Sequence, residues 1–319
     1  MKTICIIGAS GYIGSKLSEY YSNRKKYILI GVSRNYPKEK KLFQSFFNKS
    51  ILGDINEDKI LKKIVGCKPD VIIYCVSLNQ KNSDDSAYKT MNISIGPLIK
   101  LINLISSKKF KTKFLYFSTI QVLGDYSKMK LISENTKKNP LNAYAMSHSI
   151  CEDFLMRINS NEIDICNIRL ANSYGNPVLK TCNCWHLAIN DFCKSSIIYN
   201  KIRITSNGMP QRDFIHLDDV VIVVSKLINL KKRMPNIMNL TSGITLNLLE
   251  IAHKIYQNNK NTKIILKDKV ITLKKLENLI QKNITKARFK IINIEMKKLK
   301  IKNMTSIEDG INLFFEKNV

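Results

Sequence analysis

The stretch Thr3-Ile4-Cys5-Ile6-Ile7-Gly8-Ala9-Ser10-Gly11-Tyr12-Ile13-Gly14 decides the fold of this chain. Its first part, Thr3 to Ile7, is β-branched and apolar on both faces, which is typical of a strand buried inside a parallel sheet. The glycines that follow let the backbone approach a pyrophosphate closely. A helix beginning near Tyr12 would add free N–H groups and the positive end of its dipole. This order of strand, glycine loop and helix predicts a dinucleotide site.

Length and composition are those of an ordinary globular protein. With 319 residues and 44% hydrophobic content, the chain can bury a large core, as one large domain or two closely joined ones. Its longest apolar runs are too short to span a membrane, and the early first strand leaves no room for a signal peptide. Cys5, Cys75 and Cys166 fall in predicted core strands, as expected of reduced cysteines. We therefore expect a cytoplasmic protein that makes no membrane contact.

The charge and the remaining cysteines do not predict a nucleic-acid or metal site. The formal charge of +27 comes mostly from Lys residues dispersed along the chain, which predicts solvated helix faces that would also attract an anionic nucleotide. No aromatic-basic platform or recognition motif for nucleic acid appears. Cys182-Asn183-Cys184, with His186 and Cys193 nearby, lacks the C-x-x-C spacing of zinc sites. We expect no metal and no nucleic-acid partner.

The residues after the second predicted strand, Tyr27 to Val32, indicate which nicotinamide cofactor is bound. Many NAD enzymes place Asp or Glu there to accept hydrogen bonds from the adenosine ribose 2′-hydroxyl. This chain has Ser33 and Arg34 instead, so a guanidinium is available to pair with a 2′-phosphate. The pattern favours NADP(H). NAD(H) is the alternative, with Arg34 stacked on the adenine.

The rest of the chain alternates strands and helices, which predicts a doubly wound parallel α/β sheet. Further strands are expected over residues 70–76, 113–117, 162–170 and 237–240. Helices are expected over residues 57–65, 91–107 and 220–230, and over a segment beginning near 143. We expect a dinucleotide-binding domain of residues 1–168 with 217–240. A smaller mixed α/β substrate-binding lobe would comprise residues 169–216 with 241–319, and the site would lie in the cleft between them.

Hydroxyl and imidazole groups follow at positions where such a sheet holds its ligands. Ser118 and Thr119 end the strand over 113–117. Tyr144 and His148 are spaced i and i+4, so both project from one helix face towards one pocket. A free tyrosine titrates near ~10, and a histidine, with a free pKa near ~6.5, is a cation only part of the time at neutral pH.

These motifs resemble the extended, nucleotide-sugar branch of the short-chain dehydrogenase/reductase family. The resemblance covers essentially the whole chain and rests on the Gly-x-x-Gly-x-x-Gly loop and on four further segments: Ser118–Gly124, Pro140–His148, Arg169–Pro177 and Arg212–Val220. One departure is large, because the family pattern is Tyr-x-x-x-Lys and this chain has His148 at the lysine position. In the family that ammonium lowers the pKa of the tyrosine and hydrogen-bonds the nicotinamide ribose.

The resemblance implies roles for particular residues. Thr119 would hydrogen-bond the reacting sugar oxygen, Tyr144 would exchange its proton and His148 would orient the cofactor. His148 could hold the ribose by a ring N–H; alternatively, Tyr144 acts mainly as an acid, which needs no phenolate at the outset. Arg212 would pair with the substrate diphosphate. His216 and Asp218 would cap and anchor the helix that follows.

Two sets of binding residues are implied in the same way. The cofactor is expected against Gly8, Ser10, Gly11, Tyr12, Ile13, Gly14, Ser33, Arg34, Asp54, Ile55, Cys75, Val76, Ser77, Asn92, Ser118, Tyr144 and His148. The nucleotide sugar is expected against Asn79, Gln121, Asn172 and Arg212.

The resemblance also implies the reaction. It is hydride transfer between a nicotinamide cofactor and C4 of a nucleotide-activated sugar, in the biosynthesis of surface-polysaccharide sugars. Ile120 and Gln121 stand where the 4,6-dehydratases carry an Asp-Glu pair, so dehydration is not expected. A 4-ketoreductase or 4-dehydrogenase and a 4-epimerase with retained cofactor both stay open, as does an NAD(P)-binding protein with little catalysis. Family members commonly dimerise through the helices corresponding to 92–107 and 143–158, so a homodimer is expected.

Overall fold

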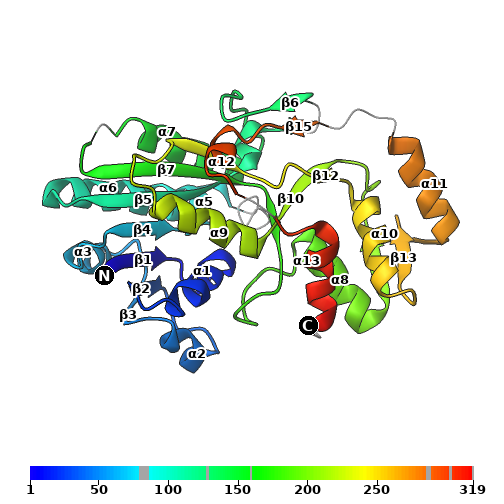
Figure 1. Ribbon diagram of the computed structural model, residues 1–319, viewed down its shortest axis with the longest axis horizontal. Coiled ribbons are helices and arrows are strands. Elements are labelled where there is room, and N and C mark those ends of the chain that lie inside the picture. Colours follow the sequence, from blue (N-terminus) through cyan, green and yellow to red (C-terminus); the bar gives the residue numbers. More distant parts are fainter. Residues whose placement is uncertain (79–85, 127–128, 159, 285–288, 302–303, 318–319) are drawn as a thin grey trace.

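A seven-stranded sheet forms the centre of the larger unit of the computed structural model, which describes residues 1–78, 86–126, 129–158, 160–284, 289–301 and 304–317 (Figure 1). Its strands run in the order β11-β7-β5-β4-β1-β2-β3, and every pairing is parallel. Their bounds are Lys2–Ile7 (β1), Tyr27–Ser33 (β2), Lys49–Leu52 (β3), Val71–Tyr74 (β4), Thr112–Thr119 (β5), Ile163–Leu170 (β7) and Ile237–Leu240 (β11). The strand order reverses between β1 and β4, where such sheets bind ligands. The predicted doubly wound α/β fold is confirmed.

Helices cover both faces of this sheet, which is why its strands are apolar on both sides. Ile4 and Ile6 of β1 belong to one buried core, and Cys5 and Ile7 belong to the core on the opposite face. The first core packs under α1 (Tyr12–Ser22), α2 (Lys40–Ser45) and α9 (Leu217–Ile228). The second packs under α3 (Asp58–Gly66), α6 (Gly96–Lys108) and α7 (Ala143–Met156).

The prediction of one long helix over residues 91–107 was wrong. Two helices occupy this region, α5 (Ala87–Ser94) and α6, and they meet at Ile95. Pro97 lies in the first turn of α6. A proline has no backbone N–H and its ring clashes with the carbonyl of the preceding turn, so a continuous helix cannot form through it.

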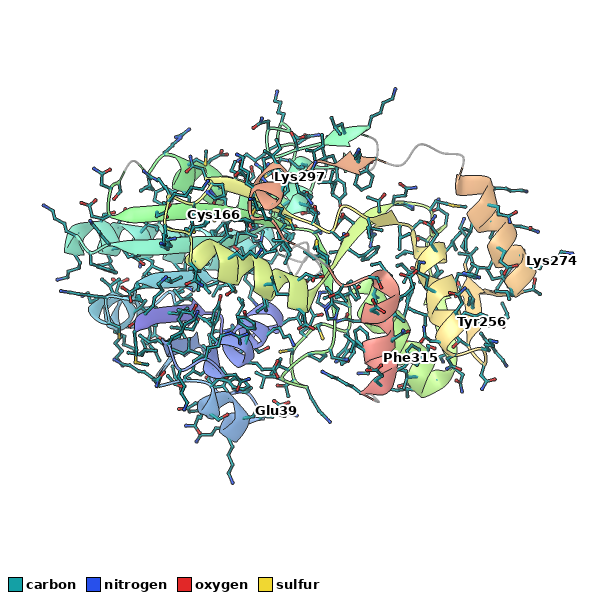
Figure 2. All side chains as sticks on the ribbon, in the orientation of Figure 1. Glu39, Cys166, Tyr256, Lys274, Lys297 and Phe315 are labelled. Carbon is teal, nitrogen blue, oxygen red and sulfur yellow. The ribbon has the colours of Figure 1, made fainter. Side chains whose placement is uncertain are left out.

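A smaller unit has its own sheets, helices and hydrophobic core. Its strands are β8 (Asn172–Tyr174), β10 (Arg212–His216) and β12 (Thr245–Leu246) in one sheet, and β9 (Lys201–Ile204), β13 (Lys263–Leu266) and β14 (Lys269–Ile271) in another. Its helices are α8 (Ala188–Tyr199), α10 (Leu248–Asn258), α11 (Leu273–Ile284) and α13 (Ile307–Glu316). Figure 2 shows Cys166 within the large sheet and Tyr256 and Phe315 among the helices of the smaller unit.

The C-terminal part of the chain touches both units. β15 (Lys290–Ile291) pairs with β6 (Leu131–Ile132), and α12 (Ile294–Lys298) packs against β11. Met296 of α12 joins the first core of the large sheet. The division into residues 1–168 with 217–240 and 169–216 with 241–319 stays a prediction. Within the described residues, no helix has the length and apolar character needed to cross a membrane.

Candidate active site

The glycine loop after β1 forms a close backbone cradle. Gly8 has a φ of +86°, which only glycine adopts easily. A Cβ atom at Gly14 would collide with the carbonyl oxygen of Gly8, so glycine here lets α1 pack directly on the loop. Gly11 is the N-cap of α1 and has no side chain to cap it. The N–H groups of Tyr12 and Ile13 therefore face the loop without intrahelical acceptors, and the cradle fits a pyrophosphate.

The Tyr12 side chain serves a different purpose from its backbone. Its hydroxyl donates to the carbonyl of Gly175 at 2.7 Å and accepts from the Asn190 side chain at 3.0 Å. Burial raises the pKa of this phenol well above its ordinary value. The Tyr12 side chain thus joins α1 to the segment that leads into the smaller unit. Only the backbone N–H group of Tyr12 is therefore available for the predicted cofactor contact.

The first turn of α9 is tied to α1 in the same region. His216 is the N-cap of α9, and its Nδ1 accepts from the Asp218 N–H at 3.3 Å. The Asp218 carboxylate in turn pairs with Lys16 of α1 at 2.9 Å. The structure therefore gives His216 and Asp218 the anchoring role that the sequence indicated.

A segment that sequence reasoning left without a function lies over the glycine loop. Cys182 Sγ donates to the Ser10 carbonyl at 3.4 Å and lies 3.7 Å from Ser15 Oγ. Its neighbour Thr181 donates from its N–H and its hydroxyl to the Glu39 carboxylate, at 3.1 and 2.7 Å. The C-x-C segment therefore packs against the glycine loop and the start of α1. No grouping of three or more potential metal ligands occurs in the part of the chain that the structure describes.

The residues predicted to bind the adenosine part of the cofactor lie at the C-terminal ends of β2 and β3. Ser33 pairs with Leu52 in the sheet register, so Arg34 and Asp54 leave the sheet at the same edge. Arg34 is exposed, whereas Ser33 is buried and donates to the Asn35 carbonyl at 2.8 Å. Asp54 accepts from the N–H of a neighbouring loop residue at 2.9 Å, and the adjoining Ile55 is buried.

The chain after β4 passes beside the glycine loop. The Cys75 N–H donates to the Ile7 carbonyl at 2.9 Å, and the Cys75 carbonyl lies against Gly8. Val76 is half-buried and Ser77 is exposed. Of two further predicted residues, Asn92 is exposed on α5, and Asn79 falls outside the described residues.

The three predicted catalytic residues meet at the end of β5. Thr119 Oγ1 accepts from the Gln121 N–H at 3.2 Å and so caps η1 (Ile120–Leu123). The Thr119 side chain also hydrogen-bonds the half-buried Tyr144, which lies with its ring edge-on to His148 at 4.7 Å between centroids. Thr119, Tyr144 and His148 are therefore neighbours.

His148 is buried and neutral. Its side chain is 1% exposed, and burial lowers the pKa of its imidazole to about 4. Nδ1 lies 2.8 Å from the hydroxyl oxygen of Tyr116, whereas Nε2 is buried without a hydrogen-bond partner among the described residues. Burial also raises the pKa of Tyr144, an effect only partly offset by Thr119. At neutral pH Tyr144 is a protonated phenol beside an uncharged ring.

One turn further along α7 the polar groups are charged. Glu152 accepts from Ser118 Oγ at 2.6 Å and from Arg169 Nη2 at 2.9 Å, and all three side chains are buried. Arg169 also donates to the Glu134 carbonyl at 3.2 Å. Ser118, predicted as a cofactor contact, is thus held by α7 and fixes the end of β5. The i+4 spacing of Glu152 after His148 puts both residues on one face of α7. It does not show that Arg169 is the partner of Glu152, which depends on the fold.

The predicted substrate residues come from two places. Gln121 is half-buried in η1, next to Thr119. Asn172 is on β8 and donates to the Asp213 carbonyl at 3.0 Å, and Arg212 is exposed on the neighbouring β10. A residue that the sequence did not single out, the buried Tyr126, hydrogen-bonds Asn172 and lies near Arg212.

A buried carboxylate holds the loop beside this second group. Asp213 accepts from the N–H groups of Ser242 and Gly243 at 2.8 and 2.7 Å. Burial raises its pKa to about 7 despite these hydrogen bonds. Its role is to fix the loop after β11 against β10.

Comparison with known proteins follows this geometry. A doubly wound sheet whose glycine loop opens the first helix defines a dinucleotide-binding protein of the Rossmann class. The sequence model of the NAD dependent epimerase/dehydratase family matches residues 4–241. The chain therefore belongs to that family of nicotinamide-dependent enzymes, and the predicted resemblance is confirmed. No curated protein matches the sequence.

Solved structures share the fold at low sequence identity. UDP-glucose 4-epimerase from Thermotoga maritima, solved with UDP-glucose, has a TM-score of 0.82 at 17% identity, covering 99% of both chains. TunA, an NAD-dependent NDP-hexosamine 5,6-dehydratase of tunicamycin biosynthesis, has a TM-score of 0.79 at 18% identity, covering 99% of this chain and 97% of that one. RMD from Pseudomonas aeruginosa, complexed with NADPH, has a TM-score of 0.78 at 16% identity, covering 100% and 99%.

Proposed function

We propose that this protein reduces a ketone at C4 of a nucleotide-activated sugar. The observation that carries the proposal is the protonated Tyr144 phenol beside the uncharged ring of His148. A nicotinamide cofactor, when bound, supplies the hydride for such a reduction. The glycine cradle of Gly8, Gly11 and Gly14 supports its binding.

The protonation states of the site residues support the reductive direction. Oxidation of a sugar hydroxyl needs a base, and within the described residues no cation lowers the pKa of Tyr144 towards that role. Reduction needs an acid that protonates the developing alkoxide, and a phenol does this without prior ionisation. Thr119, which hydrogen-bonds Tyr144, orients the same oxygen. The phenol proton goes to the sugar oxygen, and Tyr144 regains a proton from solvent.

The favoured cofactor is NADP(H), with NAD(H) as the alternative. Arg34 is exposed at the end of β2, where its guanidinium can pair with a 2′-phosphate. Both cofactors occur among proteins of this fold, since RMD was solved with NADPH and TunA is NAD-dependent. Arg34→Ala should weaken NADPH binding by about tenfold, the size of a charge-assisted contact, and leave NADH binding nearly unchanged. Equal losses for both cofactors would refute the 2′-phosphate contact.

The substrate class and setting belong to the same proposal. UDP-glucose in the Thermotoga maritima epimerase supports a nucleoside diphosphate sugar, with Arg212 on the diphosphate and Asn172 and Gln121 nearby. We place the reaction in the cytoplasm, in the supply of sugars for surface polysaccharides. Two copies would pair through the exposed side chains of α7, which include Met146 and Ile150.

The test measures turnover of two substrates, a UDP-linked 4-keto sugar and UDP-glucose. The purified protein is incubated with NADPH or NADH and a UDP-linked 4-keto sugar, and loss of the reduced cofactor is followed by absorbance. A cofactor deuterated at C4 of its nicotinamide should leave deuterium at C4 of the sugar. Tyr144→Phe should lower turnover by about 10²- to 10⁴-fold, the range of general acid catalysis, and leave cofactor affinity nearly intact.

The alternatives give different results in the same assay. A 4-epimerase, which relatives of this fold also include, would interconvert UDP-glucose and its C4 epimer when NAD⁺ or NADP⁺ is supplied, without net change of the cofactor. Cofactor binding with no turnover of either substrate would indicate an NAD(P)-binding protein with little catalysis.

A further inference from the structure

The end of the large unit that lies opposite the glycine loop is densely basic. All strands of the large sheet are parallel, so the loops that lead into them lie at one edge and the glycine loop lies at the other. Figure 1 shows the first edge beside the N-terminus, on the side away from the smaller unit. We call its exposed cations, which precede β2, β4, β5, β7 and β11, the basic end: Lys25, Lys26, Lys68, Lys108, Lys109, Lys111, Arg157, Lys231, Lys232 and Arg233.

Carboxylates at this edge are fewer and already engaged. Asp70, Glu162 and Asp164 each accept a hydrogen bond from within the chain, at 2.7, 2.8 and 3.1 Å. Among the described residues, one ion pair joins them to the basic end, between Asp164 and Arg233 at 3.9 Å. The opposite edge is balanced at the ends of β2 and β3, where Arg34 and Asp54 both leave the sheet. Positive charge is therefore concentrated at one end of the large unit.

The basic end extends in two dimensions. α1 and α9 cover one face of the sheet, whereas α3, α6 and α7 cover the other, so the segments that follow these helices place cations on both sides of the sheet edge. Neighbouring strands lie about 4.8 Å apart, so an edge of seven strands is about 30 Å long. A field of this extent fits a plane of negative charges better than a single strand of them.

The side chains of the basic end favour a lipid surface over nucleic acid. Most of them are Lys, a compact point charge, whereas nucleic-acid sites favour Arg and aromatic side chains that stack on bases. Two large exposed aromatic side chains, Tyr88 and Tyr199, lie elsewhere in the chain. Met1 and Met156 are exposed at this end. Two apolar side chains offer little area for insertion, so the contact would be with headgroups.

We propose that the basic end docks on the phosphate headgroups of an anionic lipid bilayer, with the glycine loop facing away from it. Each Lys or Arg near such a surface strengthens binding by about fivefold, and the attraction falls off within a Debye length. Small water-soluble ligands would still reach the opposite edge of the sheet. This inference goes beyond the proposed function and does not depend on it. It departs from the expectation of no membrane contact, which rested on the lack of apolar runs long enough to span a membrane.

Vesicle sedimentation tests the proposal. The whole protein is mixed, at about 0.1 M NaCl, with vesicles of phosphatidylcholine alone or with about 30% phosphatidylglycerol added. It should bind the anionic vesicles and not the neutral ones, and about 0.5 M NaCl should release it. Lys108→Gln/Lys109→Gln/Lys111→Gln should weaken binding by about 100-fold, and Lys231→Gln/Lys232→Gln, on the other side of the sheet edge, by about 25-fold.

Three lysines of the smaller unit provide the matched control. Lys269 on β14 and Lys274 and Lys275 on α11 are exposed like those of the basic end. Lys269→Gln/Lys274→Gln/Lys275→Gln removes the same net charge as the triple variant of the basic end. Because these side chains lie away from the docked face, it should weaken vesicle binding by less than about threefold.

The outcomes separate a docking face from attraction by net charge. Equal losses for the two triple variants would overturn the inference, as would equal binding of the wild type to anionic and neutral vesicles. Tighter binding to duplex DNA or RNA than to anionic vesicles, at equal phosphate concentration, would also overturn it.

Cofactor binding checks the orientation on the membrane. NADPH or NADH binding, followed by the fluorescence of the reduced cofactor, should be the same for free and vesicle-bound protein. Loss of cofactor binding on the vesicles would mean that the opposite edge is docked, and would overturn the inference. Free protein that binds neither cofactor would count against the proposed function and leave the vesicle results standing.

Discussion

Two polar clusters lie along the buried face of α7, about one turn apart, and they are built differently. The neutral cluster comprises Tyr116, Tyr144 and His148, and the charged cluster comprises Ser118, Glu152 and Arg169. In the charged cluster each side chain has a partner, with Glu152 accepting from Ser118 at 2.6 Å and from Arg169 at 2.9 Å. In the neutral cluster Nε2 of His148 has no partner within the described residues.

The difference separates a scaffold from a binding site. Buried polar groups in folded proteins are hydrogen-bonded, and each exception needs an explanation. The charged cluster is complete and fixes α7 against β5 and β7. The neutral cluster has a buried nitrogen without a partner among the described residues and contains Tyr144, the proposed acid. Removing a member of the first should therefore affect folding, and removing a member of the second should affect binding.

The largest effect on stability is expected for Arg169→Met. This change leaves the Glu152 carboxylate buried without its bidentate partner. Breaking a buried ion pair costs about 3–5 kcal/mol, so the free energy of unfolding at pH 7 should fall by that amount. Urea denaturation followed by circular dichroism measures it.

The control for this comparison is the double variant Glu152→Leu/Arg169→Met. Replacing both charges with apolar side chains should recover most of the lost stability, because no charge is then left buried. His148→Gln, in the neutral cluster, should change the stability at pH 7 by about 1 kcal/mol or less. A loss for His148→Gln as large as that for Arg169→Met would contradict the division into scaffold and site.

The next effect is a pH dependence that belongs to the neutral cluster. The folded-state pKa of His148 is lowered from its ordinary value of 6.5 to about 4 by burial, and the groups that face it, Tyr116, Tyr144 and Cys151, are uncharged at neutral pH. Between these values the unfolded chain binds a proton that the folded chain does not. Stability should therefore fall as pH is lowered through this window, by about 3 kcal/mol in total at 1.36 kcal/mol per pKa unit.

His148→Gln isolates that contribution. Unfolding free energies of the wild type and the variant are measured from pH 7 down to pH 4, and their difference is plotted against pH. The wild type should lose stability more steeply than the variant below about pH 6.5. Parallel curves would show that the pKa of His148 is the same in the folded and the unfolded protein, and Tyr144 would then have a cation beside it part of the time at neutral pH.

The sequence was informative where local chemistry sets both structure and function. The glycine loop could be read locally, because Gly8 has a φ of +86° and a Cβ atom at Gly14 would collide with the carbonyl oxygen of Gly8. The i and i+4 spacing of Tyr144 and His148 likewise put both rings on one helix face. The break before Pro97 was missed, although a proline in the first turn is a local signal of a helix start.

The sequence was uninformative where function depends on which strand lies behind which helix. The sequence predicted the strand that carries Tyr116, but the contact of Tyr116 with His148 depends on how α7 crosses the sheet. The contacts of Cys182 with Ser10 and of Thr181 with Glu39 span well over a hundred residues of chain. No local pattern encodes such separations, so these contacts required the structure.

The smallest effect is expected at the edge of the charged cluster, for Lys138→Met. Lys138 is half-buried; its ammonium donates to Asp153 at 2.7 Å and to the Ser149 carbonyl at 3.0 Å, and it lies 3.8 Å from Glu152. Solvent screens this contact, and exposed ion pairs contribute about 1 kcal/mol or less. The variant should therefore lose under about 1 kcal/mol by urea denaturation at pH 7.

The control repeats the urea denaturation of the wild type, Lys138→Met and Arg169→Met at raised salt. Salt screens exposed ion pairs and affects buried ones much less, so about 1 M NaCl should remove most of the difference between the wild type and Lys138→Met while leaving that of Arg169→Met in place. A loss for Lys138→Met that matches Arg169→Met and survives salt would mean that the Glu152 carboxylate needs both cations. The charged cluster would then extend to the surface, and its separation from the neutral cluster would rest on Arg169 and Lys138 together.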